Sequence, residues 1–393
     1  MRSRVLLSGL VIGAWGCGFQ SKPADGPPTD PVDASQPAPP VDAPPGQPPP
    51  IDGPPTACTT FSSLTDTCKL ALTTDVTFSA PVTYDTAGPT ISGAQNVPRM
   101  MLKLGGVDTE VILAHNITIS AGLRATGAKP LAIIASGTVT IGNSVVLDLS
   151  NGGAGGRPSC PGGPAPGQDD AGGAAGGGGG GFGGAGGRGG NGNGNRGGSN
   201  GGAGGAAATM PTGLQGGCPG ATGGRSAGGM SAAPAGLPGG ALYIAAAGSI
   251  SLGDQAVINA GGGGGRRSGF TEGGGSGGGA GGMIFLESPT ITGATAVLAA
   301  NGGGGGGGND TSTQIVGKDG SAGLGSTSAA PGGGGANAST PGGNGGALGH
   351  TAGNDVPGNP DGGAGGGGGG CGFIRVLSAN QNIVTSSPAM VTQ

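Results

Sequence analysis

Residues Gly239–Gly265 read GGALYIAAAGSISLGDQAVINAGGGGG, two short apolar segments separated by a turn and followed by a run of glycine. The same order recurs at Leu131–Gly156 (LAIIASGTVTIGNSVVLDLSNGGAGG) and at Met283–Gly308 (MIFLESPTITGATAVLAANGGGGGGG). Short segments rich in Val, Ile and Leu favour β-strands, so each copy predicts strand, turn, strand and glycine. Repetition on this scale is typical of stacked units, because one unit cannot bury its apolar face alone.

Shorter relatives of this unit begin at Val111 and Gly372, and further short strand patterns fill residues 75–150. We therefore predict an all-β fold, a parallel β-helix-like solenoid. The glycine runs start at the same phase of successive copies. They are predicted to leave the stack as insertions on one edge, at about residues 152–240, 261–282 and 302–370.

Composition limits the classes of function. The chain of 393 residues contains 103 glycines and 32 prolines, but only 3% aromatic and 9% charged residues. Such a composition is typical of low-complexity sequence. The low charge and the recurring apolar segments nevertheless favour a thin packed core over disorder throughout. A net charge of -4 disfavours electrostatic binding of nucleic acid.

The N-terminal residues have the pattern of an export signal. Met1–Arg4 is a short basic segment, Val5–Ala14 is apolar, and small residues precede Cys17. An apolar stretch this short does not span a bilayer core about 30 Å thick. The pattern resembles a bacterial lipoprotein lipobox, which implies a signal peptide at residues 1–16 and a lipid anchor on Cys17. Soluble secretion is the alternative, because Ala14 and Gly16 also suit an ordinary signal peptidase.

Residues 17–56 are rich in proline and include the run PPTDPVDASQPAPPVDAPPGQPPPIDGPP. Proline restricts φ and lacks a donor, so this segment favours polyproline II and cannot join a sheet interior. We predict a disordered linker that, at about 3.1 Å per residue, holds a domain on the order of 100 Å from a membrane. Residues 57–130 are then an N-terminal cap with the first strands, and residues 131–393 carry the repeats.

Five cysteines follow Cys17, and export favours disulfides among them. Two pairs are predicted. Cys58 and Cys68 stand together at the start of the folded region, whereas Cys160 and Cys218 lie in Cys-Pro-Gly contexts at the two ends of the first glycine insertion. Cys371 is left over, either as a buried free thiol or as a sign that the pairing differs.

Between Gly183 and Ala206 the glycines approach a three-residue period, GGA GGR GGN GNG NRG GSN GGA GGA. Three residues per turn is the polyproline II repeat, and chains without Cβ can approach closely enough to pair main-chain groups. These segments resemble the bacterial PE-PGRS glycine-rich proteins, although the PE helical domain is absent. They also resemble glycine-rich antifreeze proteins and certain phage tail-tip adhesins. The resemblance implies polyglycine II-like layers within the insertions.

Few residues are candidates for chemistry. The loops GGGGND at Gly305–Asp310 and AGND at Ala352–Asp355 resemble the calcium-binding turns of RTX repeats, which makes Asp310 and Asp355 candidate calcium ligands. Solvated turns are the alternative, because no tandem copies follow. No catalytic residue is predicted, since the carboxylates are scattered among glycine loops and neither a nucleophile elbow nor a phosphate loop occurs. No cofactor besides calcium is expected.

Leader, linker and repeats together predict an exported, lipid-anchored protein of the bacterial outer membrane or cell surface. Its expected role is structural or adhesive, without catalysis. The expected partners are the membrane, through the anchor, and cell-surface or matrix components. A polysaccharide-acting lyase or hydrolase is the alternative. Binding of ice or glycan by a repetitive face differs from the first function only in ligand.

Overall fold

The computed structural model describes residues 58–88, 90–94, 96–193, 198–226, 232–269, 271–310, 316–337, 339–350, 352–356 and 362–392. All of them belong to the compact unit Cys58–Gln393. Regular structure in these ranges is β-strand apart from one short 3-10 helix, η1 (Thr67–Lys69), whose N-cap Asp66 accepts a hydrogen bond from the Cys68 N–H. These ranges contain no helix with the length and apolarity of a membrane span.

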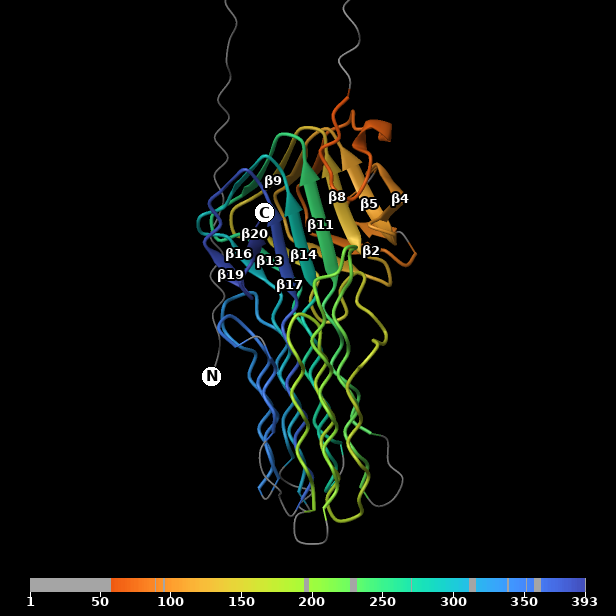
Figure 1. The fold of residues 1–393 in the computed structure, drawn as a ribbon, viewed down its shortest axis with the longest axis vertical. Helices are drawn as coiled ribbons and strands as arrows, with labels where there is room; N and C mark the ends of the chain where they lie inside the picture. Colours follow the sequence, from red (N-terminus) through yellow and green to blue (C-terminus); the bar gives the residue numbers. More distant parts are fainter. Residues whose placement is uncertain are drawn as a thin grey trace, which may run out of the picture. The chain divides into compact units, whose positions relative to one another are not determined.

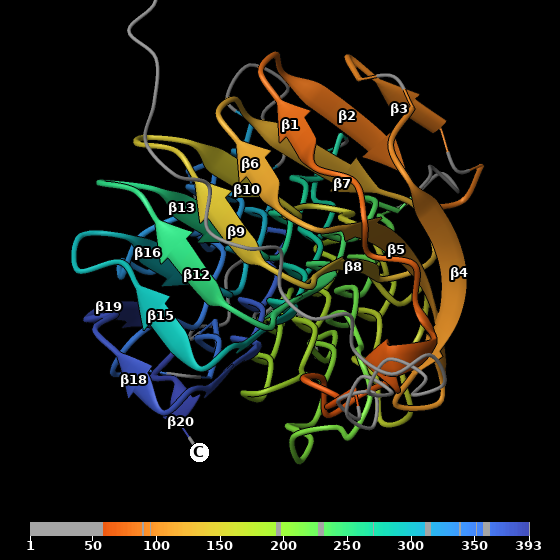
Figure 2. The ribbon, with the colours of Figure 1, turned by 90° about the horizontal axis from the view of Figure 1, so that it is seen from above.

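The strands form three sheets, in which neighbouring strands come from distant parts of the chain (Figures 1 and 2). Sheet A contains β1 (Val76–Phe78), β6 (Ile117–Ile119), β9 (Thr138–Ile141), β12 (Ser249–Leu252), β15 (Thr290–Thr292) and β18 (Asn380–Gln381). Sheet B contains β19 (Thr385–Ser387), β16 (Val297–Ala299), β13 (Val257–Asn259), β10 (Val146–Asp148), β7 (Leu123–Thr126), β2 (Val82–Asp85) and β3 (Thr90–Ser92). Sheet C contains β20 (Val391–Thr392), β17 (Phe373–Leu377), β14 (Met283–Glu287), β11 (Ala241–Ala246), β8 (Leu131–Ala135), β5 (Val107–Ala114) and β4 (Arg99–Leu104).

The recurring sequence units lie strand upon strand. In sheet C, Leu242 of the central copy pairs in parallel with Leu131 of the first copy and with Ile284 of the third. The second strands of the copies pair in sheet A, and the third strands pair in sheet B. Equivalent apolar residues are thus stacked, and they form the main core between the sheets.

The strands β8, β11 and β14 of sheet C are buried on both faces. The inner face contributes to the main core, and the outer face packs against residues 58–72, which we call the N-terminal strap, and against Phe182 and Leu214. Phe61, Leu64 and Leu72 of the strap pack in this second apolar cluster. Burial on both faces explains why β8, β11 and β14 are apolar at nearly every residue, with Glu287 at the end of β14 as the charged exception, whereas β9 of sheet A alternates exposed and buried residues.

The segments between β10 and β11, β13 and β14, and β16 and β17 run side by side away from the sheets (Figure 1). We call them together the glycine bundle. Their main chains hydrogen bond between segments: Gly177 N–H donates to Gly275, Gly178 N–H to Ala165 and Gly179 N–H to Gly187, at 2.8–3.0 Å. Each successive residue therefore uses a different neighbouring segment.

Glycine is required inside this bundle because a Cβ would have no space. Ideal Cβ atoms on three successive glycines would meet main-chain oxygens at 1.8 Å (Gly176 to Gly365), 2.3 Å (Gly177 to Ala221) and 1.9 Å (Gly178 to Ala203). Three segments accept hydrogen bonds from segment 176–181, and three more face its Cβ positions. Six segments therefore enclose it. Segments 274–281, 302–308 and 363–370 are enclosed in the same way, and we call these four the interior segments.

The predicted parallel β-helix-like solenoid with polyglycine II-like insertions is wrong. The strands form three open, mostly parallel sheets, and sheets B and C each end in an antiparallel strand, β3 and β4 respectively. At β4 the reason is local, because Gly105 and Gly106 take positive φ (55° and 87°) and reverse the chain into β5. The glycine runs lie between β10 and β11, β13 and β14, and β16 and β17, and they form one bundle because their main-chain groups find partners in one another.

Candidate functional site

The surface of the glycine bundle is formed by segments that surround the four interior ones. We call them the perimeter segments, and their side chains occur at every third position. Segment 200–206 exposes Asn200, Ala203 and Ala206, and segment 341–347 exposes Pro341 and Asn344. The two glycines between such positions face neighbouring backbone; at Gly202 an added Cβ would lie 1.9 Å from the Ala165 oxygen. GGX triplets thus place exposed side chains on these two perimeter segments, whereas the few side chains of the interior segments, such as Ser276 and Ala364, are small and buried.

Side-chain oxygens on the perimeter accept main-chain N–H groups of the next perimeter segment. These N–H groups do not face an interior segment. Without the side-chain oxygen they would have no hydrogen-bond partner in the protein. The pairs are Gln168 Oε1 with Asn200 N, Asn191 Oδ1 with Gly201 N, Asn344 Oδ1 with Gly332 N, Asp169 Oδ1 with Arg225 N, Asp355 Oδ1 with Arg188 N and Asp319 Oδ1 with Arg267 N, at 2.6–2.9 Å. Asn, Gln and Asp on this surface therefore complete the backbone hydrogen bonding.

Aspartates of the perimeter contact arginines of neighbouring segments. In three of these pairs an aspartate accepts the N–H of an arginine, and Asp319 Oδ2 also lies 2.7 Å from Arg266 Nη1. Burial raises the pKa of Asp319, but the Arg267 N–H and the Arg266 guanidinium outweigh it, so the pKa is below its usual value. Of these three pairs, the one at Asp319 thus also includes a guanidinium contact.

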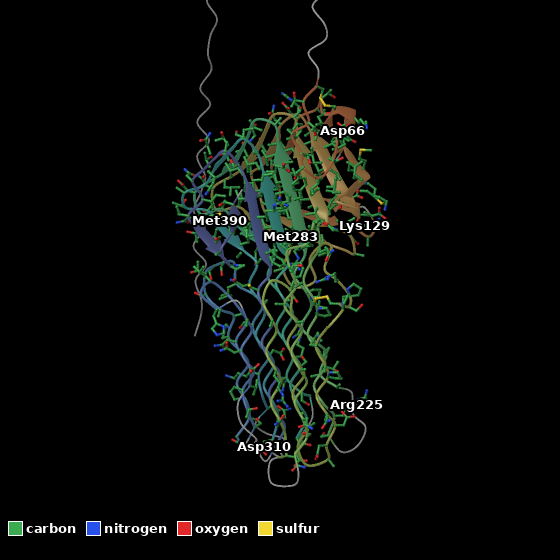
Figure 3. All side chains as sticks on the ribbon, viewed as in Figure 1. Asp66, Lys129, Arg225, Met283, Asp310 and Met390 are labelled. Atoms are coloured by element: carbon green, nitrogen blue, oxygen red, sulfur yellow. A yellow bond between two sulfur atoms is a disulfide. The ribbon has the colours of Figure 1, made fainter. Side chains whose placement is uncertain are left out.

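The candidate calcium ligands occur in this bundle (Figure 3, where Asp310 and Arg225 are labelled near its end away from the strands). Asp355 accepts the Arg188 N–H at 2.6 Å, and the main-chain oxygen of Asp310 accepts the Glu272 N–H at 3.2 Å. Within the ranges that the structure describes, no three His, Cys, Asp or Glu side chains are placed to share a metal ion. Residues 311–315 and 357–361, which follow the two loops, lie outside those ranges.

Four of the predicted cysteines are joined in two disulfides. Cys58–Cys68 closes a loop in the N-terminal strap, and Cys160–Cys218 links residues 58 positions apart in the first glycine segment. Cys371 is a buried free thiol, and burial raises its pKa to about 12. Cys17, the predicted lipidation site, lies outside the described residues, as do the signal peptide and linker.

Two buried carboxylates were not singled out by sequence reasoning. Glu110 of β5 accepts a hydrogen bond from the Tyr84 hydroxyl at 2.7 Å, and Glu287 of β14 accepts one from Tyr243. Burial, and then the neighbouring carboxylate, raise the pKa of each tyrosine. The chain has only two tyrosines, and each pairs with a buried glutamate. A lone Tyr or Glu in an otherwise apolar strand was the available signal, but its partner is too distant in sequence to identify.

No protein-family model, curated protein or solved structure matches this chain. The features above are therefore interpreted from their own chemistry.

Proposed function

We propose that this protein is an exported, lipid-anchored surface protein with a structural or adhesive role, in which the glycine bundle is the contact element. The proposal for export and anchoring comes from the leader and the proline-rich linker before residue 57. The observation that carries the contact role is the perimeter, where side chains occur at every third residue on an extensively hydrogen-bonded backbone.

A contact role gives a physical reason for so much ordered glycine. Fixing a residue costs about 1–2 kcal/mol of conformational entropy, and glycine loses the most freedom. The bundle offsets this cost on folding through hydrogen bonds between its segments. Because this surface is already ordered, binding costs it little further conformational entropy. Many weak contacts can then add up to adhesion.

Adhesion of cells tests the proposal. Cells without the gene should lose attachment to one another or to a surface, and the wild-type gene should restore it. Surface exposure is checked separately by protease accessibility on intact cells. Unchanged attachment, with the protein shown to be outside the wild-type cell, contradicts the adhesive role.

Perimeter variants connect adhesion to the bundle. Ala203→Glu and Ala206→Glu add charges to exposed positions of one perimeter segment and should weaken attachment. Met101→Glu and Val384→Glu add equal charge to the strand region, at side chains that are 50% and 74% exposed, and should have little effect. If the strand variants weaken attachment as much as the perimeter variants, the bundle is not the contact element.

A further inference from the structure

A groove lies between the N-terminal strap and the turns that follow β11, β14 and β17. Its volume is about 770 Å³, within the range of small-molecule sites. Phe61 of the strap, Pro289 after β14 and Leu377 of β17 provide apolar walls. Hydroxyl side chains such as Ser63 and Ser378 provide polar ones. Among the described residues that line the groove, Glu287 is the only charged one.

The Glu287 carboxylate holds the strap against sheet C. Ser63 donates its N–H to both carboxylate oxygens at 3.0 Å and its hydroxyl to Oε2 at 2.9 Å. Tyr243 donates its hydroxyl to Oε2 and is 2.8 Å from Ser62 Oγ. Among the described residues, Oε1 receives only the shared Ser63 N–H, so one of its lone-pair directions remains for a ligand donor.

Every partner of this carboxylate among the described residues is a neutral donor, although Glu287 is only 8% exposed. The other tyrosine–glutamate pair differs, because the Tyr84 hydroxyl that bonds Glu110 is also contacted by the Arg99 side chain. A carboxylate removed from water is costly unless an opposite charge accompanies it. At Glu287 the hydrogen-bond donors among the described residues are Ser63 and Tyr243, and the carboxylate lines the groove.

We propose that this groove binds a small molecule that carries a primary ammonium group on an apolar body. The ammonium donates to Glu287 Oε1, and the apolar body packs against Phe61, Pro289 and Leu377. An ammonium suits the site for two reasons, since it brings a positive charge to the carboxylate and fills the remaining acceptor direction. The groove is on the strand region and not on the glycine bundle, so this inference stands or falls independently of the adhesive role.

Hexylamine and hexanol are a matched pair of probes, because they share the apolar chain and differ in charge. Ligand-observed NMR titration of the folded protein should show hexylamine binding at least about tenfold more tightly than hexanol, as expected for a hydrogen bond between charged groups. Equal binding of the two probes, or no detectable binding of hexylamine, overturns the proposal. This comparison requires no substitution.

Two variants then locate the ammonium. Glu287→Gln keeps a hydrogen-bond acceptor for Ser63 and Tyr243 but removes the charge, so the preference for hexylamine should disappear. Glu110→Gln neutralises the other buried, tyrosine-bonded carboxylate, which does not line the groove, and should keep the preference. If Glu287→Gln retains the preference while folded by circular dichroism, the ammonium is not bound at Glu287 and the proposal is wrong.

Discussion

At the scale of single residues, the direction in which a Cβ would point decides whether glycine is required. Gly333 and Gly334 are adjacent in one perimeter segment but differ in the space that a Cβ would have. A Cβ on Gly333 would lie 1.9 Å from the Lys318 main-chain oxygen, whereas the nearest atom to one on Gly334 is Lys318 Cδ at 4.0 Å. Two neighbouring positions with the same chemistry therefore form a matched test of the bundle.

We expect Gly333→Ala to destabilise the protein by at least about 1–3 kcal/mol, because a backbone oxygen must move to accommodate the methyl group. Gly334→Ala should be neutral or stabilising by about 0.4–1 kcal/mol, because alanine has less freedom in the unfolded chain. Urea denaturation of both variants measures the difference. Equal destabilisation by the two substitutions would show that the segments do not pack as described.

Burial of Cys371 predicts its reactivity. The thiolate is the reactive form, and burial raises the pKa of this thiol to about 12. At pH 8 the group is therefore protonated as well as inaccessible, and iodoacetamide should not modify it in the native protein. It should react readily in guanidinium chloride without a reducing agent, while the two disulfides remain closed. Rapid modification of the native protein contradicts the buried position.

At the scale of elements, the perimeter segments depend on side-chain oxygens to complete their hydrogen bonding. Asn344 and Asn354 are a matched pair, because both are exposed asparagines of neighbouring perimeter segments. Asn344 Oδ1 accepts the Gly332 N–H at 2.9 Å, whereas the contact between the two asparagines is a main-chain hydrogen bond that substitution preserves.

Asn344→Ala should cost about 0.5–1.5 kcal/mol, the usual net value of one hydrogen bond, and should accelerate amide exchange at Gly332. Asn354→Ala should leave exchange at Gly332 unchanged. Hydrogen exchange followed by NMR resolves the two cases. A Gly332 amide that remains equally protected in Asn344→Ala would argue against a capping role for these side chains.

At the scale of the whole molecule, the anchor and the folded unit make separate predictions. The lipobox-like pattern predicts that Cys17→Ser prevents acylation, and the protein should then move from the membrane fraction to the soluble fraction. Fractionation and mass spectrometry of the mature N-terminus measure this change. The folded unit should be unaffected, because its described contacts begin at Cys58. Membrane association that persists in Cys17→Ser contradicts lipid anchoring at this residue.

Sequence pattern alone located the repeated strands and separated them from the glycine runs. Apolar residues recurring in register at Leu131, Leu242 and Ile284 are local signals, since a strand can be identified from the few residues that compose it. The division into perimeter and interior was not predicted, because it depends on which neighbouring segments a Cβ would meet.

Only the tertiary structure decided that the strands form three open sheets with antiparallel edges, and that the glycine runs form one body. It also brought Tyr243, Glu287 and Ser63 together beside a groove. The physical reason is that a glycine segment has no side chains with which to specify its partners. Gly177 bonds Gly275 because the strands on which their segments end are already stacked, so the positions of the segments follow from the sheets and not from the segments themselves.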